Sequence, residues 1–182
     1  MMLRLFAALP VPDFISERVE PLMKGVPGAK WRPRENFHIT LAFFGEIDHA
    51  LTEELDHELA EIRIAPFELQ LKSAGHFGRN PPSSIWLGVA GGEALETLAR
   101  RCARAARRAG VSMEKRNYTP HLTLAYLSGA TDISRLQSFE SRLGLYRSER
   151  FIADRFHLYS SWSRKTGRAN SYEIEAEYPL QP

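Results

Sequence analysis

Two short motifs of one type contain the residues best suited to catalysis in this chain. His38 and Thr40 form the first and His121 and Thr123 form the second, and both fit the pattern His-x-Thr-x. The β-branched and aromatic content around the first motif, and the apolar run that begins with the second, favour strands. Residues two apart on a strand share a face, so each histidine should lie beside its threonine. The apolar residues between and after them should face the core.

Two imidazoles and two hydroxyls facing one cleft would suit acid-base chemistry on a phosphodiester. Hydrolysis needs a base to take a proton from water and an acid to protonate the leaving oxygen. Histidine can do either task, because its unperturbed pKa is about 6.5. Threonine hydroxyls can bind the non-bridging phosphate oxygens. A strained cyclic phosphate reacts more readily than a linear diester, so no metal is required. The motifs are chemically alike, which leaves open which histidine is the acid.

The elements expected along the chain form an internal repeat with the motifs at equivalent points. Each half should run strand, helix, motif strand, helix, strand. His38 lies 33 positions after Leu5, and His121 lies 35 positions after Trp86 in the corresponding strand. Such agreement suggests two pseudo-symmetric lobes. Strands are expected over residues 3–9, 37–44, 67–71, 85–89, 122–127, 155–162 and 171–179, with helices over 11–24, 51–64, 93–109 and 133–143.

The composition predicts one domain over residues 1–182 and excludes several protein classes. Apolar residues are 43% of the chain, enough for a core, and the net charge of +2 excludes a heavily basic nucleic-acid coat but allows a local basic cleft. The single cysteine, Cys102, excludes an intramolecular disulfide and a cysteine-based zinc site. We therefore expect a reducing, cytoplasmic setting. No apolar run approaches the roughly 20 residues needed to span a bilayer, so we expect no membrane partner.

The motifs and their flanking segments resemble the 2H phosphoesterase superfamily, whose members have two His-x-Thr-x motifs. Within it, the chain is similar to the bacterial and archaeal RNA 2′,3′-cyclic phosphodiesterases, also called LigT- or ThpR-like 2′-5′ RNA ligases. The resemblance covers nearly the full length, and its most specific segments are residues 4–8, 36–46, 119–124 and 156–161.

This resemblance implies an α+β fold with a bilobal pseudo-two-fold duplication, two antiparallel sheets facing a central cleft and helices outside. It implies metal-independent, cofactor-free hydrolysis of RNA 2′,3′-cyclic phosphate ends to 2′-phosphates. In the family's usual assignment His38 is the proton donor to the leaving 3′ oxygen and His121 is the proton acceptor that activates water. Thr40 and Thr123 would be phosphate ligands. The expected partner of the protein, which we expect to be a monomer, is RNA with a cyclic phosphate end, tRNA fragments included.

One position departs from the family pattern. Many relatives have arginine two positions after the second motif, where this chain has Tyr126. Another cation must then meet the substrate phosphate, and the candidates are Lys115, Arg116, Arg164, Lys165 and Arg168. The residues expected to bind substrate are Phe43, Arg116, Tyr126, Arg164 and Arg168. Trp31 could stack on a base or pack inside the protein. The arginine-rich face of the helix over 93–109 is more readily interpreted as solvated than as RNA-binding.

Two other functions remain open from the residues. The first is a 2H enzyme with another substrate or reaction: a 2′-5′ linked oligonucleotide, a cyclic ADP-ribose phosphate, or 2′-5′ RNA ligation. Tyr126 keeps this alternative open. The second is a non-catalytic RNA-binding module, which would keep its RNA affinity after both motif histidines were replaced. The presence of two intact motifs argues against it.

Overall fold

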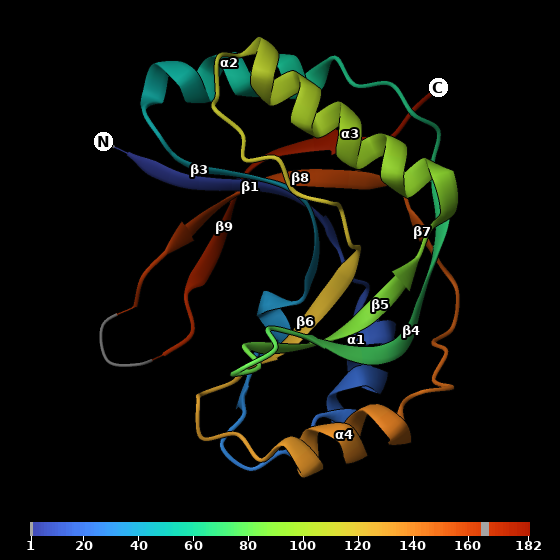
Figure 1. The fold of residues 1–182 in the computed structure, drawn as a ribbon. Helices are drawn as coiled ribbons and strands as arrows, with labels where there is room; N and C mark the ends of the chain where they lie inside the picture. Colours follow the sequence, from blue (N-terminus) through green and yellow to red (C-terminus); the bar gives the residue numbers. More distant parts are fainter. Residues whose placement is uncertain (1, 165–167) are drawn as a thin grey trace.

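A curled, mostly antiparallel sheet forms the centre of the protein (Figure 1), whose computed structural model describes residues 2–164 and 168–182. The strand order is β7-β4-β5-β6-β3-β1-β8-β9, and β2 also pairs with β6. Antiparallel pairing with helices outside confirms the predicted α+β class. The strands are β1 (Leu3–Pro10), β2 (Lys30–Trp31), β3 (His38–Ile47), β4 (Phe67–Phe77), β5 (Ser84–Ala90), β6 (His121–Tyr126), β7 (Phe151–Ala153), β8 (Arg155–Trp162) and β9 (Ser171–Pro179).

The strand order is pseudo-symmetric about the junction of β3 and β6. Strand β4 follows β3 along the chain but pairs with β5 in the other half. Strand β8, which comes after β6 and the short β7, pairs with β1. Each half of the sequence repeat therefore contributes one later strand, β4 or β8, to the opposite half of the sheet. The two expected sheets are joined by the pair Ile39–Leu122 into one continuous path of strands. This exchange fixes the two motif strands next to each other.

Helices cover the sheet in two groups (Figure 1). Helix α2 (His49–Ala60) packs on α3 (Gly92–Arg108) over the β1, β3 and β8 side, whereas α4 (Ile133–Arg142) lies against β4 with α1 (Asp13–Val19) beside it. The predicted amphipathic helix over 93–109 is confirmed, since its apolar face, including Cys102, is buried. Gly110 follows this helix with a positive φ of 90°, as its predicted C-terminal cap requires.

Several element boundaries differ from the sequence prediction. The α-helix expected over 11–24 ends at Val19, and a 3-10 turn over Glu20–Leu22 accommodates Pro21. Strand β4 continues to Phe77, well past the predicted end at residue 71. Strand β2 and the 3-10 turn over Arg34–Asn36 were not predicted. Within the described residues, no helix has the length and apolar character that crossing a membrane would take.

Candidate active site

The two motifs lie on neighbouring antiparallel strands. His38 opens β3 and His121 opens β6, and the strands meet at the central motif residues, Ile39 and Leu122. Continuing this register by one residue each way puts each histidine opposite the threonine of the other motif. Opposite Cβ atoms in such a pair are about 5 Å apart, and diagonal ones about 7–8 Å. The four polar residues therefore form one patch, with the two imidazoles on its diagonal.

Burial along the motif strands confirms the predicted division into a core face and a polar face. Ile39 and Leu122 are fully buried, whereas the histidine and threonine of each motif are partly exposed. Beyond the motifs, Phe43 and Tyr126 are 49% and 46% exposed. Strict alternation would have put position 126 on the core face. A register shift between β5 and β6 interrupts the alternation, so the tyrosine is exposed at its strand end.

Both imidazoles are oriented by the same type of backbone hydrogen bond. Nδ1 of His38 lies 2.7 Å from the carbonyl oxygen of Asn36, and Nδ1 of His121 lies 2.6 Å from that of Thr119. A carbonyl can only accept, so each Nδ1 carries the proton and donates it. In the neutral ring this leaves Nε2 unprotonated. Each histidine therefore has one nitrogen available for proton transfer.

Aromatic side chains surround His38. The ring of Phe6 lies 4.9 Å from the imidazole between centroids, and that of Tyr172 lies 5.1 Å away at 86°. Tyr159 stacks on Phe6 at 5.2 Å. These contacts fix the imidazole plane and remove water from most of its surface.

His121 has a corresponding but less polar surrounding. Phe77 meets its ring edge-on at 4.8 Å, and Trp86 lies 6.3 Å away. The indole of Trp86 lies so close to Gly75 that an added Cβ there would be 2.3 Å from the ring. Glycine at position 75 is therefore what lets the indole occupy its place in the wall beside the histidine.

This environment favours the neutral form of both histidines. The pKa of His38 is lowered to about 4, mainly by burial, with a smaller lowering effect from the charges of Arg32 and protonated His121, and the hydrogen bond to Asn36 opposes this shift. Burial also lowers the pKa of His121, opposed by the hydrogen bond to Thr119. In the free protein, Nε2 of His38 is therefore a proton acceptor at neutral pH.

Arg32 is a functional candidate that the sequence analysis missed. Its guanidinium lies over the ring of Tyr126 at 5.1 Å, and Nη2 donates to the hydroxyl of Tyr172 at 3.1 Å. Its backbone N–H donates to the carbonyl of Leu124 at 2.7 Å, next to β6. Among the described residues, no carboxylate forms an ion pair with it. The strand before Arg32 has only two residues and shows no periodicity. The one signal in the sequence was therefore the position of this basic residue next to Trp31.

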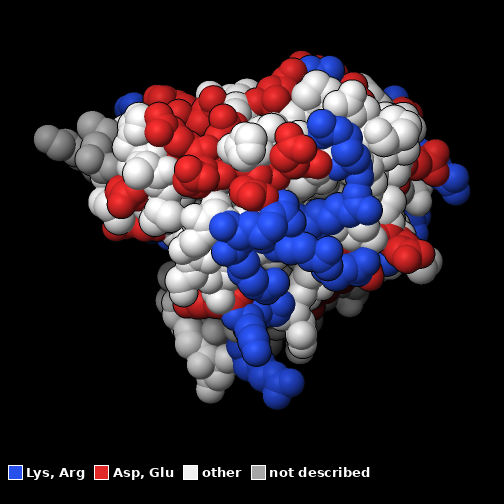
Figure 2. All heavy atoms as spheres, turned by 90° about the horizontal axis from the view of Figure 1, so that it is seen from above, with Lys and Arg blue, Asp and Glu red and all other residues white. Residues whose placement is uncertain are grey.

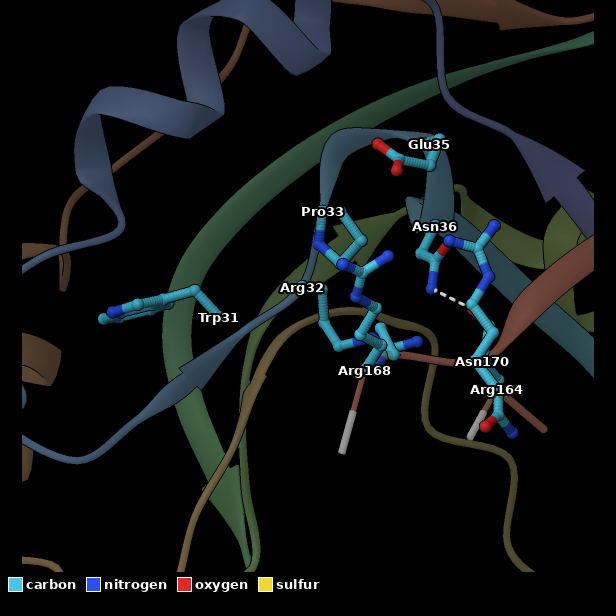
Figure 3. A pocket seen from close by; sticks show the side chains of 9 residues that line it. Trp31, Arg32, Pro33, Glu35, Asn36, Arg164, Arg168 and Asn170 are labelled. Carbon is cyan, nitrogen blue, oxygen red and sulfur yellow. Dashed lines mark hydrogen bonds between the residues drawn. The ribbon is translucent and has the colours of Figure 1, made fainter. Parts of the chain in front are cut away.

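Of the predicted substrate-binding residues, the structure places Arg164 and Arg168 beside Arg32 in one pocket (Figure 3). Phe43 is exposed and lies under the guanidinium of Arg4 at 5.2 Å. Arg116 is 80% exposed and pairs with Glu114, outside this pocket. The candidate cation Lys115 is also exposed, and Lys165 lies outside the described residues.

Trp31 and the basic helix face both make contacts within the protein. The ring of Trp31 packs on Phe139 of α4 at 5.7 Å, as the packing interpretation expects, and Trp31 also lines the pocket. Figure 2, which views the protein from above, shows a band of Lys and Arg beside an acidic area. On α3, Arg108 pairs with Glu58 of α2, and Arg101 donates to the carbonyl of Arg63. Part of the arginine face of α3 is thus occupied by contacts within the protein.

Comparisons with known proteins found consistent matches. The family model of the 2′-5′ RNA ligase superfamily matches residues 11–163. An RNA 2′,3′-cyclic phosphodiesterase of Thermotoga maritima is 31% identical, with 97% of this chain and 96% of the relative covered. One of Bacillus subtilis is 32% identical, with 86% and 89% covered. The crystal structure of Escherichia coli LigT complexed with 3′-AMP is 26% identical, with a TM-score of 0.78 and 100% of both chains covered.

Proposed function

This chain belongs to the 2′-5′ RNA ligase superfamily, and we propose on that basis that it hydrolyses RNA 2′,3′-cyclic phosphate ends to 2′-phosphates. The observation that carries the proposal is the matched pair of motif histidines. Both donate from Nδ1 to a backbone carbonyl, and both lie on adjacent antiparallel strands. Their free Nε2 atoms can then act on one phosphate from two sides.

In the proposed reaction, Nε2 of His121 takes a proton from water while the water oxygen forms a bond to phosphorus. The bond between phosphorus and the 3′ oxygen breaks, and Nε2 of His38 protonates that oxygen. The product has a 2′-phosphate and a free 3′ hydroxyl, and the enzyme has exchanged one proton between its histidines. The hydroxyls of Thr40 and Thr123 bind the non-bridging oxygens and hold the group in place. No metal takes part in these steps.

The proposed donor must be protonated when the substrate is bound. Burial and the charge of Arg32 favour neutral His38 in the free protein. A cyclic phosphate brings one negative charge into the same space, and an opposite charge nearby raises a histidine pKa. Substrate binding and protonation are therefore coupled, and the substrate itself promotes the catalytic form of the pair.

A single-turnover assay in EDTA tests the activity. The substrate is a short RNA ending in a 2′,3′-cyclic phosphate, with the products resolved as 2′- or 3′-phosphate. We expect only the 2′-phosphate, and we expect His38→Ala and His121→Ala each to lose about 10²- to 10⁴-fold in rate while keeping the wild-type circular dichroism spectrum. The control is His57→Gln, since His57 is exposed on α2. Absence of wild-type turnover, or a requirement for a divalent metal, would overturn the proposal.

A substrate with sulfur in place of the 3′ bridging oxygen tests the roles of the two histidines. A thiolate leaves without being protonated, so the loss caused by His38→Ala should shrink on this substrate. The loss caused by His121→Ala should persist, because water must still be activated. The reverse pattern would exchange the two roles and leave the activity itself in place.

A further inference from the structure

A pocket of about 340 Å³ is lined in part by the segment that directly precedes His38 (Figure 3). One wall comes from the segment before β3, with Arg32, Glu35 and Asn36. The other comes from the two ends of the connection between β8 and β9, with Arg164 and Arg168. Segments more than 120 residues apart in the sequence thus build one hollow.

The lining is strongly cationic. Three guanidinium groups line the pocket, against the single carboxylate of Glu35. In the part of the chain that the structure describes, Arg32, Arg164 and Arg168 form no ion pair with a carboxylate. Arg34 shows the contrast, because it pairs with Glu17 at 3.1 Å and with Asp13 at 3.2 Å on the outer surface. The three pocket arginines therefore remain available for an external anion.

The pocket is tied to the catalytic histidine through two residues. The side chain of Asn36 is buried and donates from Nδ2 to the carbonyl of Asn170 at 2.7 Å, which closes the pocket wall. The backbone carbonyl of Asn36 accepts the hydrogen bond from Nδ1 of His38. Arg32 makes a second link, because it donates to the hydroxyl of Tyr172, whose ring packs on the imidazole of His38 at 5.1 Å.

We infer that this pocket binds the RNA backbone phosphate on the 5′ side of the terminal nucleoside, with Arg32, Arg164 and Arg168 as its ligands. The inference rests on the proposed function. A mononucleoside cyclic phosphate has one phosphate, which the histidines engage. A second phosphate is present only when another nucleotide precedes the cyclic end. Arginine binds phosphate oxygens through paired N–H donors, which suits a diester held from two walls. The pocket therefore selects RNA strands over mononucleotides.

Three substrates isolate the charge of that phosphate. They are uridine 2′,3′-cyclic phosphate, the dinucleotide UpU with a 2′,3′-cyclic end, and the same dinucleotide with a neutral methylphosphonate linkage. We expect kcat/KM for the charged dinucleotide to exceed both others by about tenfold, on the scale of a few partly exposed charge contacts. The advantage of the charged dinucleotide should also decrease as the salt concentration rises. Binding the extra phosphate releases counterions, and this release is less favourable at high salt.

Variants assign the effect to the pocket. Arg168→Gln and Arg164→Gln should each lower the ratio of kcat/KM between the charged and neutral dinucleotides about twofold, and the double variant should lower it about fourfold and leave the contribution of Arg32. Arg34→Gln is the matched control, since it removes an arginine two positions from Arg32 that already has carboxylate partners. The ratio should be unchanged in it.

Binding of the product distinguishes failure of this site from failure of the activity. The affinity of the wild-type protein for UpU ending in a 2′-phosphate is compared with that of its methylphosphonate analogue by calorimetry. Charge-dependent binding that needs Arg164 and Arg168 supports the pocket even if no substrate is turned over, in which case only the proposed activity fails. Turnover with equal kcat/KM for the charged and neutral dinucleotides would overturn the pocket and leave the activity intact.

Discussion

Acid should destabilise this protein through the largely desolvated imidazole of His38, and replacing that residue should remove its part of the effect. The pKa of His38 is lowered to about 4 in the folded protein, against about 6.5 in an unfolded chain. Between these values the unfolded state binds more protons than the folded state. Stability therefore rises with pH across this window and is lost as the pH falls from 6.5 toward 4.

The size of the effect follows from the two pKa values. Integration of the proton-binding difference gives a cost of about 0.2 kcal/mol at pH 7 and about 2 kcal/mol at pH 5. In His38→Gln this contribution is absent at every pH. The variant also loses packing against Phe6 and Tyr172, but that loss does not depend on pH. The packing loss therefore cancels when the change in the free energy of unfolding between two pH values is compared.

Urea unfolding followed by tryptophan fluorescence measures this difference. Between pH 7 and pH 5, wild type should lose about 2 kcal/mol more free energy of unfolding than His38→Gln. His57→Gln, which replaces an exposed histidine, should behave like wild type. If the variant and wild type lost the same free energy of unfolding within about 0.5 kcal/mol, the imidazole of His38 would not be desolvated as its surroundings indicate. Substrate binding would then not need to raise its pKa, and the proposed coupling would be wrong.

Three further outcomes follow from the site. Because burial lowers the pKa of both motif histidines, kcat/KM should peak below about pH 6.5 and fall at higher pH, and a profile flat to pH 8 would contradict this. Gly75→Ala should cost about 1–3 kcal/mol and lower kcat by displacing Trp86, whereas Gly129→Ala, whose Cβ has 3.9 Å of space, should do neither. Arg32→Gln should raise KM, and in that background Tyr126→Leu should add nothing, as a double-mutant cycle in kcat/KM would show.

The sequence predicted those features that depend on local periodicity or on the repeat. Alternation along the motif strands put the four polar residues on one face, because each motif lies in an apolar strand whose alternate residues enter the core. The helix with Cys102 on its buried face was predicted from its spacing for the same reason. The repeat indicated that His38 and His121 occupy equivalent points, and their matched hydrogen bonds agree with this.

Features that depend on which strands pair with each other could not be predicted from local sequence patterns. Strand β2 exists because Lys30 and Trp31 pair with β6, and no pattern in two residues predicts that. The guanidinium of Arg32 reaches Tyr126 only through this pairing. The exchange of β4 and β8 between the halves also has no local signal, because an isolated strand does not specify its partner.

His38 and His121 have different surroundings, although their motifs are alike and do not indicate which histidine is the acid. In an in-line displacement, water enters opposite the leaving oxygen, and the leaving 3′ oxygen stays on the ribose. The acid must therefore lie on the side where the RNA strand lies. Arg32 of the cationic pocket donates to Tyr172, whose ring packs on His38, whereas Phe77 and Trp86 beside His121 provide no cation. An RNA strand held by the arginines would place its ribose toward His38 and leave the opposite side of the phosphate to water and His121. The proposed strand-binding arginines would therefore favour His38 as the proton donor, and they would break the symmetry of the duplicated fold.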